Sequence, residues 1–280
     1  MAFHANPAMY ADHIHLKVSN LTRSLGFYHD VLGFRILEEY AGFAQLTAGG
    51  LQTCITIEQV NDALPLNPAN TGLFHVAFLV PSRRELAKVL RHLIHLEYPL
   101  YGASDHLVSE AIYLTDPDGN GIEIYADRDP GEWEWARGQV KIESLPLNTD
   151  DLMSEIGENG WEGIPEKTII GHIHLQVSDL EETGFFYTEG FGFDIVTRYG
   201  RKALFLSSEN YHHHIGLNIW NSAGGASPSE KNIGLKHFSI SIPETEREIV
   251  AGRLKSSGWP VKEEAEKYAV TDPSGNKVIF

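Results

Sequence analysis

The sequence predicts an α+β protein built from one strand–helix–strands module that occurs four times. The first observation is a long internal repeat, in which HIHLKVSNLTRSLGFYHDVLGF from His13 matches HIHLQVSDLEETGFFYTEGFGF from His172. The second is a shorter repeat, in which TDPDGNGIEIY from Thr115 matches TDPSGNKVIF from Thr271. Between these lies a third pair, FHVAFLVPSRRELAKVLRHL from Phe74 and KHFSISIPETEREIVAGRL from Lys236.

Each segment of the repeat predicts an element. The alternating apolar residues at the start of each long repeat indicate a strand, and the Ser-Asn or Ser-Asp pair that follows favours a capped helix ending at a Gly. The third pair is typical of a strand, a Pro turn and an amphipathic helix, and the Asp-Pro-x-Gly-Asn segments predict turns between two short strands. The resulting modules span residues 1–60, 71–127, 168–222 and 233–280, and a connector with a helix near 150–158 spans 128–167.

The composition narrows the class of protein. Of 280 residues, 42% are hydrophobic, which is enough for well-formed cores. The 22 basic and 38 acidic residues give a formal charge of −16, which disfavours partners such as nucleic acid and anionic lipid. Cys54 is the single cysteine, which excludes an internal disulfide. The start of the chain lacks a secretory layout and no apolar run reaches the roughly 18 residues of a membrane helix, so we expect a soluble cytoplasmic protein.

Four histidines share one place in the repeat. His13, His75, His172 and His237 each open the first strand of a module, and each precedes the end of the following turn by the same spacing. A single histidine there is most simply a polar strand end near solvent. Core packing rarely places a histidine at the same repeat position in four modules, so the set of four favours a functional role.

Glu123 is the second unusual residue, because it lies within the apolar strand Gly-Ile-Glu-Ile-Tyr. An unpaired carboxylate in such a strand would be costly if buried. Glu123 could instead face solvent on an edge strand, with Ile122 and Ile124 in the core. The matching position of the fourth module is Ile279, so the four modules do not all carry this carboxylate.

With these motifs the chain resembles the vicinal oxygen chelate superfamily, and within it the bacterial two-domain extradiol ring-cleaving dioxygenases of the catechol 2,3-dioxygenase group. The most specific segments are GHIHLQVSDL, YHHHIGLNIW and IYLTDPDGNGIEIYADR. The resemblance implies βαβββ modules that pair into two eight-stranded cup-like half-barrels. It also implies that one cup holds a metal and that the other is vacant.

The resemblance implies a metal site made of one His from each of two paired modules and one Glu. Module two would supply His75 and Glu123. The third ligand would be His13 if modules one and two pair, or His172 if modules two and three pair, and the repeat alone allows both.

Other residues of the family pattern favour the second pairing. The acid–base His of the family matches His213 in module three, whereas the matching stretch of module one, residues 52–55, has no His. The family Tyr matches Tyr113, and a further His matches His106 with a slightly different spacing. The resemblance therefore implies metal ligands His75, His172 and Glu123 between modules two and three, with modules one and four forming the vacant cup.

Several neighbouring side chains also have expected places in this pattern. His15 and His174 share a face with the strand-opening histidines and are candidates for a supporting group or an alternative ligand. The run that contains His213 is expected to lie in a strand with Ile215, so its neighbours His212 and His214 are expected to point away from the site. The candidates for the pocket wall are Phe74, Asn218 and Trp220.

The resemblance implies an extradiol dioxygenase that converts catechol-type diols and O2 to 2-hydroxymuconic semialdehydes, a step in aromatic hydrocarbon catabolism. Fe(II) is the expected cofactor, and Mn(II) suits the same ligands. The alternatives are a glyoxalase-like isomerase or thiol transferase, although the last strand of module three, residues 216–219, lacks the second Glu of that class, and a metal-free binding protein. The resemblance allows a homodimer or higher homo-oligomer.

Overall fold

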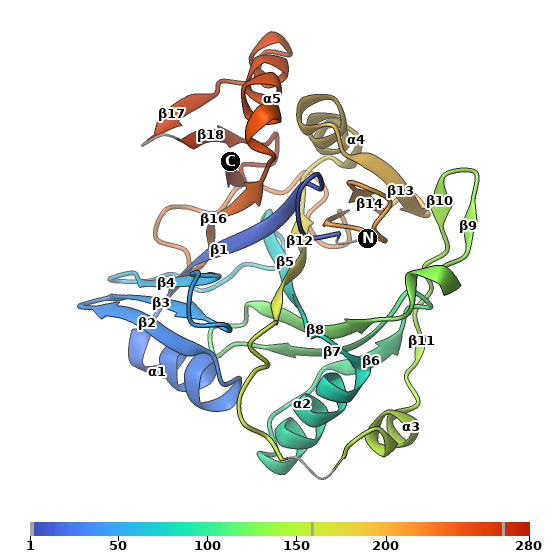
Figure 1. Cartoon of the computed structure of the whole chain (residues 1–280). Helices are drawn as coiled ribbons and strands as arrows, with labels where there is room; N and C mark the ends of the chain where they lie inside the picture. The colour runs from blue at the N-terminus through green and yellow to red at the C-terminus, as the bar shows by residue number, and fades with distance from the viewer. Residues whose placement is uncertain (1–2, 158–159, 265–266) are drawn as a thin grey trace.

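The computed structural model describes residues 3–157, 160–264 and 267–280. Residues 1–2, 158–159 and 265–266, which belong to the predicted first module, connector and fourth module, lie outside the described residues. In the described part, each module has the order strand, helix, three strands (Figure 1). Helices are few and strands dominate, so the α+β class predicted from the sequence is confirmed.

The first two modules cover the N-terminal half. Module one contains β1 (Tyr10–Val18), α1 (Leu21–Leu25), a π-helical turn at Gly26–Val31, β2 (Arg35–Tyr40), β3 (Phe43–Thr47) and β4 (Ile55–Gln59). Module two contains β5 (Gly72–Leu79), α2 (Arg83–His95), β6 (Gly102–Asp105), β7 (Ser109–Thr115) and β8 (Gly121–Asp127).

The connector and the last two modules follow. The connector holds a short helical turn at Pro130–Glu132, β9 (Trp135–Ala136), β10 (Gln139–Val140), β11 (Leu145–Pro146) and α3 (Thr149–Ser154). Module three contains β12 (Ile169–Gln176), α4 (Leu180–Phe185), a π-helical turn at Phe186–Phe191, β13 (Asp194–Tyr199), β14 (Ala203–Ser207) and β15 (Ile215–Asn218). Module four contains β16 (Gly234–Ser241), α5 (Glu244–Ser256), β17 (Lys262–Glu264), β18 (Lys267–Thr271) and β19 (Lys277–Ile279).

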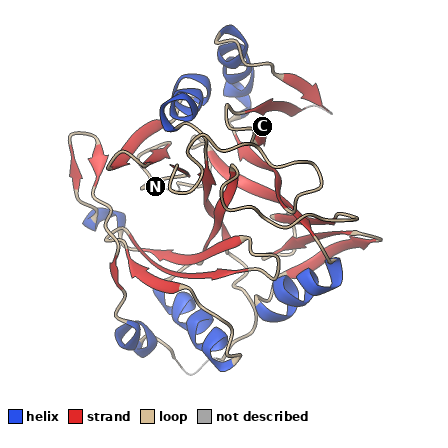
Figure 2. Cartoon of the chain, turned by 180° about the vertical axis from the view of Figure 1, so that it is seen from behind, coloured by secondary structure: helices blue, strands red, loops and turns tan. Residues whose placement is uncertain are grey.

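Two large curled sheets contain these strands (Figures 1 and 2), except β9 and β10, which pair only with each other. One has the order β17-β18-β19-β16-β1-β4-β3-β2 and joins the strands of modules one and four. The other has the order β11-β6-β7-β8-β5-β12-β15-β14-β13 and joins those of modules two and three. It has nine strands where eight were expected, because β11 of the connector pairs with the edge strand β6.

Local sequence explains where the elements begin. The side chains of Asn20 and Asp179 each accept a hydrogen bond from a backbone N–H of the first helical turn, as the sequence predicted. The two Asp-Pro-x-Gly-Asn turns close on their own aspartates, Asp116 and Asp272, each of which is buried and accepts from the backbone N–H of the turn's Asn. These turns set the start of β8 and β19, the last strand of each even-numbered module.

A continuous apolar core extends through both halves of the molecule, with Ile14 of β1, Val76 of β5 and Ile173 of β12 in the same cluster. The helices lie on the outside of the sheets (Figure 2). Among the helices of the described residues, none combines the length and apolar character that a membrane crossing requires.

Candidate metal centre

The register of the second sheet brings its polar side chains into one row. Tyr113 of β7 pairs with Glu123 of β8, Glu123 with Ala77 of β5, and Ala77 with His172 of β12. Residues paired across neighbouring strands point to the same face, and His75 shares that face because it lies two residues before Ala77 on β5. The small, fully buried side chain of Ala77 leaves an open space between the carboxylate and the imidazoles.

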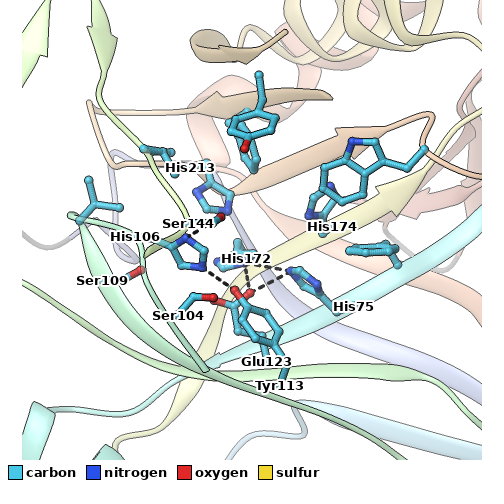
Figure 3. A pocket seen from close by; sticks show the side chains of 16 residues that line it. His75, Ser104, His106, Ser109, Tyr113, Glu123, Ser144, His172, His174 and His213 are labelled. Carbon is cyan, nitrogen blue, oxygen red and sulfur yellow. Dashed lines mark hydrogen bonds and ion pairs between the residues drawn. The ribbon is translucent and has the colours of Figure 1, made fainter. Parts of the chain in front are cut away.

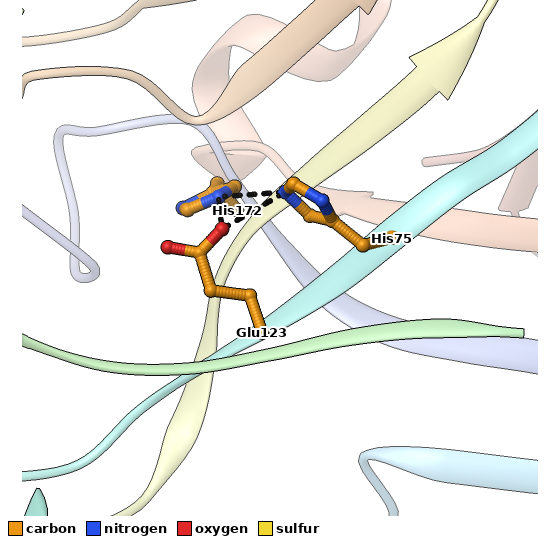
Figure 4. Close-up of side chains that lie close together, drawn as sticks. All are labelled: His75, Glu123 and His172. Carbon is orange, nitrogen blue, oxygen red and sulfur yellow. Dashed lines mark hydrogen bonds and ion pairs between the residues drawn. The ribbon is translucent and has the colours of Figure 1, made fainter. Parts of the chain in front are cut away.

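The three ligand candidates converge in that space (Figure 4). The Nε2 atom of His75 lies 3.0 Å from Oε2 of Glu123, and Nε2 of His172 lies 3.3 Å from the same oxygen. The two Nε2 atoms are 3.4 Å apart. Ligand atoms about 2.1 Å from one ion and at right angles to each other would be about 3.0 Å apart. The donor set therefore fits a metal ion with ligands on one side.

Burial sets the charges of this group. Burial opposes ionisation of Glu123, but His172 and His75 beside the carboxyl more than offset it and hold its pKa well below the usual range. Burial lowers the pKa of His172 to about 4, although the nearby carboxylate acts in the opposite direction. Near neutral pH the group thus offers a carboxylate and neutral imidazole nitrogen, the donors that divalent transition metals accept.

Within the described residues, only one group of three or more His, Cys, Asp or Glu side chains has its ligand atoms within 4.8 Å of one another. It consists of His75, Glu123 and His172. The spacing and the donor types both suit a metal. This group contains one carboxylate and no second Glu.

Tyr113 and His106 form a hydrogen-bonded pair beside the carboxylate. His106 follows β6, and its Nδ1 lies 2.6 Å from the carbonyl oxygen of Glu143. A carbonyl only accepts, so Nδ1 is the donor, and Nε2 of the neutral ring is left to accept from the Tyr113 hydroxyl at 2.6 Å. Burial, followed by the charge of Glu123, raises the pKa of Tyr113 well above its usual value.

His213 approaches the same group from module three, but from a different element than the sequence suggested. We expected the His run to lie within a strand, whereas Tyr211–His214 precedes β15, which begins at Ile215. The His213 ring is centred 4.0 Å from the His172 ring. Burial, together with the surrounding imidazoles, lowers the pKa of His213 well below its usual value, so the ring is neutral near pH 7.

The two histidines that flank His213 behave differently from each other. His214 turns away, as expected: its Nδ1 accepts from the backbone N–H of Ser208 and its Nε2 lies 2.9 Å from the carbonyl oxygen of Phe3. His212 does not turn away from His213. Its Nδ1 lies 2.8 Å from Nδ1 of His213. The sequence did not predict this contact, and the run of three histidines was its one visible sign.

His174 lies next to the ligand group without joining it. Its ring is centred 4.9 Å from that of His75, and its Nε2 accepts a hydrogen bond from the Asn218 amide at 3.1 Å. The absence of a side chain at Gly216 makes room for it, because a Cβ there would lie 2.8 Å from Cγ of His174. His174 is thus a wall of the site, and Asn218 contacts His174 instead of lining the pocket.

A cavity of about 350 Å³ opens in front of these groups (Figure 3). His75, His172, Glu123, His213, Tyr113 and His106 all line it. Its other walls are largely apolar, and they include Phe74, Val108, Ile142, Phe205 and Trp220. A small, flat organic molecule with a few oxygen atoms suits this combination of apolar walls and convergent polar groups.

A family model, the Glyoxalase/Bleomycin resistance protein/Dioxygenase superfamily, matches residues 10–124 and 169–280. These two matches cover most of the chain and correspond to its two halves. The chain belongs to this superfamily. The membership confirms the resemblance that the sequence motifs indicated.

Among the relatives, "Catechol-2,3-dioxygenase" of Bacillus subtilis (strain 168) is 43% identical over 95% of this chain and 94% of its own length. A "Metallothiol transferase FosB" of Lysinibacillus sphaericus (strain C3-41) is 28% identical over 41% of this chain and 79% of its own length. Among solved structures, a "putative dioxygenase" from Bacillus subtilis has a TM-score of 0.66 at 16% identity, covering 98% of this chain and 85% of the other. A glyoxalase I mutant from Zea mays has a TM-score of 0.60 at 16% identity, covering 99% and 93%. These structural likenesses confirm the superfamily fold.

The other sheet carries the two remaining histidines of the set, His13 on β1 and His237 on β16, whose rings are centred 5.9 Å apart. Nε2 of His13 lies 2.8 Å from Oγ1 of Thr56, and Nε2 of His15 lies 3.0 Å from Oε2 of Glu58. Glu58 also contacts Lys236, so its charge is already compensated. No metal-ligand group like that of the second sheet occurs here among the described residues.

Proposed function

We propose that this protein is an extradiol ring-cleaving dioxygenase that uses O2 to convert a catechol-type diol to a 2-hydroxymuconic semialdehyde. One observation carries the proposal: His75, His172 and Glu123 converge on one point, and His213 and Tyr113 face the same cavity. The 43% identity to a relative named catechol-2,3-dioxygenase supports the same reaction.

In the proposal, His75, His172 and Glu123 hold the metal, with Fe(II) as the native ion and Mn(II) as an ion that the same ligands accept. When bound, the metal would supply adjacent open positions for the diol and O2 and the electron transfer between them.

The protein side chains orient the diol and move its protons. His213, neutral and facing the cavity, takes a hydroxyl proton from the diol and later returns a proton to the opened ring. Phe205 and Ile142 contribute apolar surface that excludes water from the ring of the substrate.

Tyr113 and His106 act as a pair in this scheme. In the structure the Tyr113 hydroxyl donates to His106, so the phenol oxygen presents its lone pairs elsewhere. We propose that the pair acts together at a substrate oxygen in the cavity, where it would stabilise negative charge on the substrate.

Anaerobic reconstitution with Fe(II) or Mn(II), followed by catechol and O2, tests the proposal through the yellow ring-cleavage product. The wild-type protein should bind one metal and form the product, and Glu123→Ala should lose both. Normal metal content and activity in Glu123→Ala would contradict the ligand assignment, and metal-loaded protein without oxygen uptake would contradict the reaction.

A second pair of variants tests the module pairing in solution. His172→Ala should abolish metal binding, because His172 is the ligand from β12. His13→Ala should leave most of it, because His13 lies in the other sheet and contacts Thr56. The opposite result would favour a site between modules one and two.

A further inference from the structure

Strand β8 carries two carboxylates on the concave face of the second sheet. Glu123, Tyr125 and Asp127 alternate along the strand and therefore share that face. Glu123 reaches the metal-ligand group. The ring of Tyr125 is centred 5.0 Å from that of His172. Asp127, the last residue of the strand, reaches the segment before β15 and is the group whose role the proposed mechanism leaves open.

A chain of hydrogen bonds joins Asp127 to His213. Nε2 of His212 lies 2.9 Å from Oδ1 of Asp127, and Nδ1 of His212 lies 2.8 Å from Nδ1 of His213. Tyr211 donates its hydroxyl to the same Oδ1 at 3.0 Å, and the hydroxyl of Tyr125 lies 2.6 Å from that of Tyr211. His212, Tyr125 and Tyr211 are fully buried, so these contacts face little competition from water.

The donors and acceptors along this chain leave one arrangement of protons for neutral imidazoles. A carboxylate only accepts, so Nε2 of His212 must carry the hydrogen that it donates to Asp127. Nδ1 of the neutral His212 ring is then bare and accepts, which makes Nδ1 of His213 the donor. Nε2 of the neutral His213 ring is therefore the nitrogen with the free lone pair.

We propose that Asp127 and His212 are positioning residues that hold His213 in its Nδ1–H form, so that Nε2 is available to accept the substrate proton. This inference rests on the proposed function. When the O–H bond of the diol breaks, the proton forms a new N–H bond at Nε2 and the ring becomes an imidazolium. The negative charge of Asp127, relayed by the hydrogen bond of His212, stabilises that cation without itself taking the proton, as a carboxylate does for the histidine of a serine hydrolase.

The surroundings of this pair keep it in place. The ring of Tyr211 is centred 4.0 Å from that of His212, and the indole of Trp133, from the connector, is centred 5.2 Å from it. Phe3 of the N-terminal segment stacks on Trp133 at 5.5 Å. The connector and the N-terminal segment therefore cover His212, which gives both segments a role in the site.

The hydrogen-bond chain can be tested directly in the metal-free protein with ¹⁵N-labelled histidine, because long-range ¹H–¹⁵N spectra distinguish the two neutral forms. Wild-type His213 should be Nδ1–H. Asp127→Ala should lose this single form, because His212 no longer has an acceptor at Nε2. Asp127→Asn should keep it, because the amide oxygen still accepts. A wild-type His213 protonated at Nε2, or an unchanged spectrum in Asp127→Ala, would overturn the inference.

Kinetics of the metal-loaded enzyme provide a second test with a matched pair of variants. In His212→Asn the amide oxygen can replace Nδ1 as the acceptor, whereas His212→Leu has none. We expect kcat to fall on the order of 10²-fold in His212→Leu with KM and metal content nearly unchanged, and to recover largely in His212→Asn. Equal kcat values for both variants would contradict a positioning role. If the protein does not cleave catechol, the spectra still decide the proton arrangement, so the two proposals fail separately.

Discussion

Metal binding and folding should be linked in this protein, because the three ligand atoms meet only when β5, β8 and β12 pair. A ligand that binds the folded chain at one hundred times its Kd stabilises it by about 2.7 kcal/mol. The 280 residues unfold with an entropy of about 0.6 kcal/mol/K near the midpoint, at about 2.1 cal/mol/K per residue. One core extends through both sheets, so the chain should unfold as one cooperative unit. Dividing the stabilisation by the unfolding entropy gives an expected rise in Tm of about 5 °C.

The perturbation is Glu123→Gln, which keeps the volume of the side chain and removes its charge. Anaerobic scanning calorimetry with and without Fe(II) or Mn(II) measures the shift. The wild-type protein should show the full rise in Tm and Glu123→Gln almost none, because two neutral imidazoles lack the negative charge that a divalent ion requires.

A matched control comes from the other sheet. His13 is the fourth residue of β1 as His172 is the fourth residue of β12, so His13→Gln changes an equivalent residue outside the ligand group. This variant should keep the metal-dependent rise. If Glu123→Gln keeps the rise and His13→Gln loses it, the metal lies in the first sheet and the reasoning from convergence is wrong.

Three further predictions concern other side chains. Gly216→Ala should lower the free energy of unfolding by about 1–3 kcal/mol in chemical denaturation, because its Cβ would lie 2.8 Å from His174; an unchanged midpoint would mean that the ring moves freely. Tyr113→Phe and His106→Phe should be non-additive in kcat/KM by about 0.5–3 kcal/mol, because the two side chains share one hydrogen bond; strict additivity would show independent roles. Burial lowers the pKa of His237 to about 4 in the folded protein. Between pH 6.5 and 4 the unfolded state therefore binds more protons than the folded state, and the free energy of unfolding decreases as the pH is lowered. His237→Gln should flatten that slope in acid-unfolding curves, and a steeper slope would contradict the sign.

The internal repeat made the fold class predictable, because strand periodicity, helix caps and turn residues are local properties of the chain. Asn20 and Asp179 do cap helices, and the Asp116 turn does precede β8. The ninth strand of the second sheet was not predictable in this way. β11 has two residues, and it is a strand only because β6 offers it an open edge.

The family motifs singled out His75, His172, Glu123, Tyr113 and His213 as candidates, and the structure places all five at one cavity. Their roles stay predictions until the variants are measured. His212 does not line the cavity, as the sequence predicted, but its hydrogen bond to His213 was not predictable from a motif. The backbone is not a strand at that point, so alternation along a strand could not indicate this contact.

The sequence by itself determined the module, its repetition and the residue types at each repeat position, since these follow from patterns a few residues long. Only the tertiary structure decided which strands are neighbours, and hence that residues 75, 123 and 172 share one face. Sheet pairing depends on contacts between segments far apart in the chain, and a shift of one residue in register would turn the side chains of a strand to the opposite face. The same holds for Asp127, whose hydrogen bond to His212 exists only because two modules close on each other.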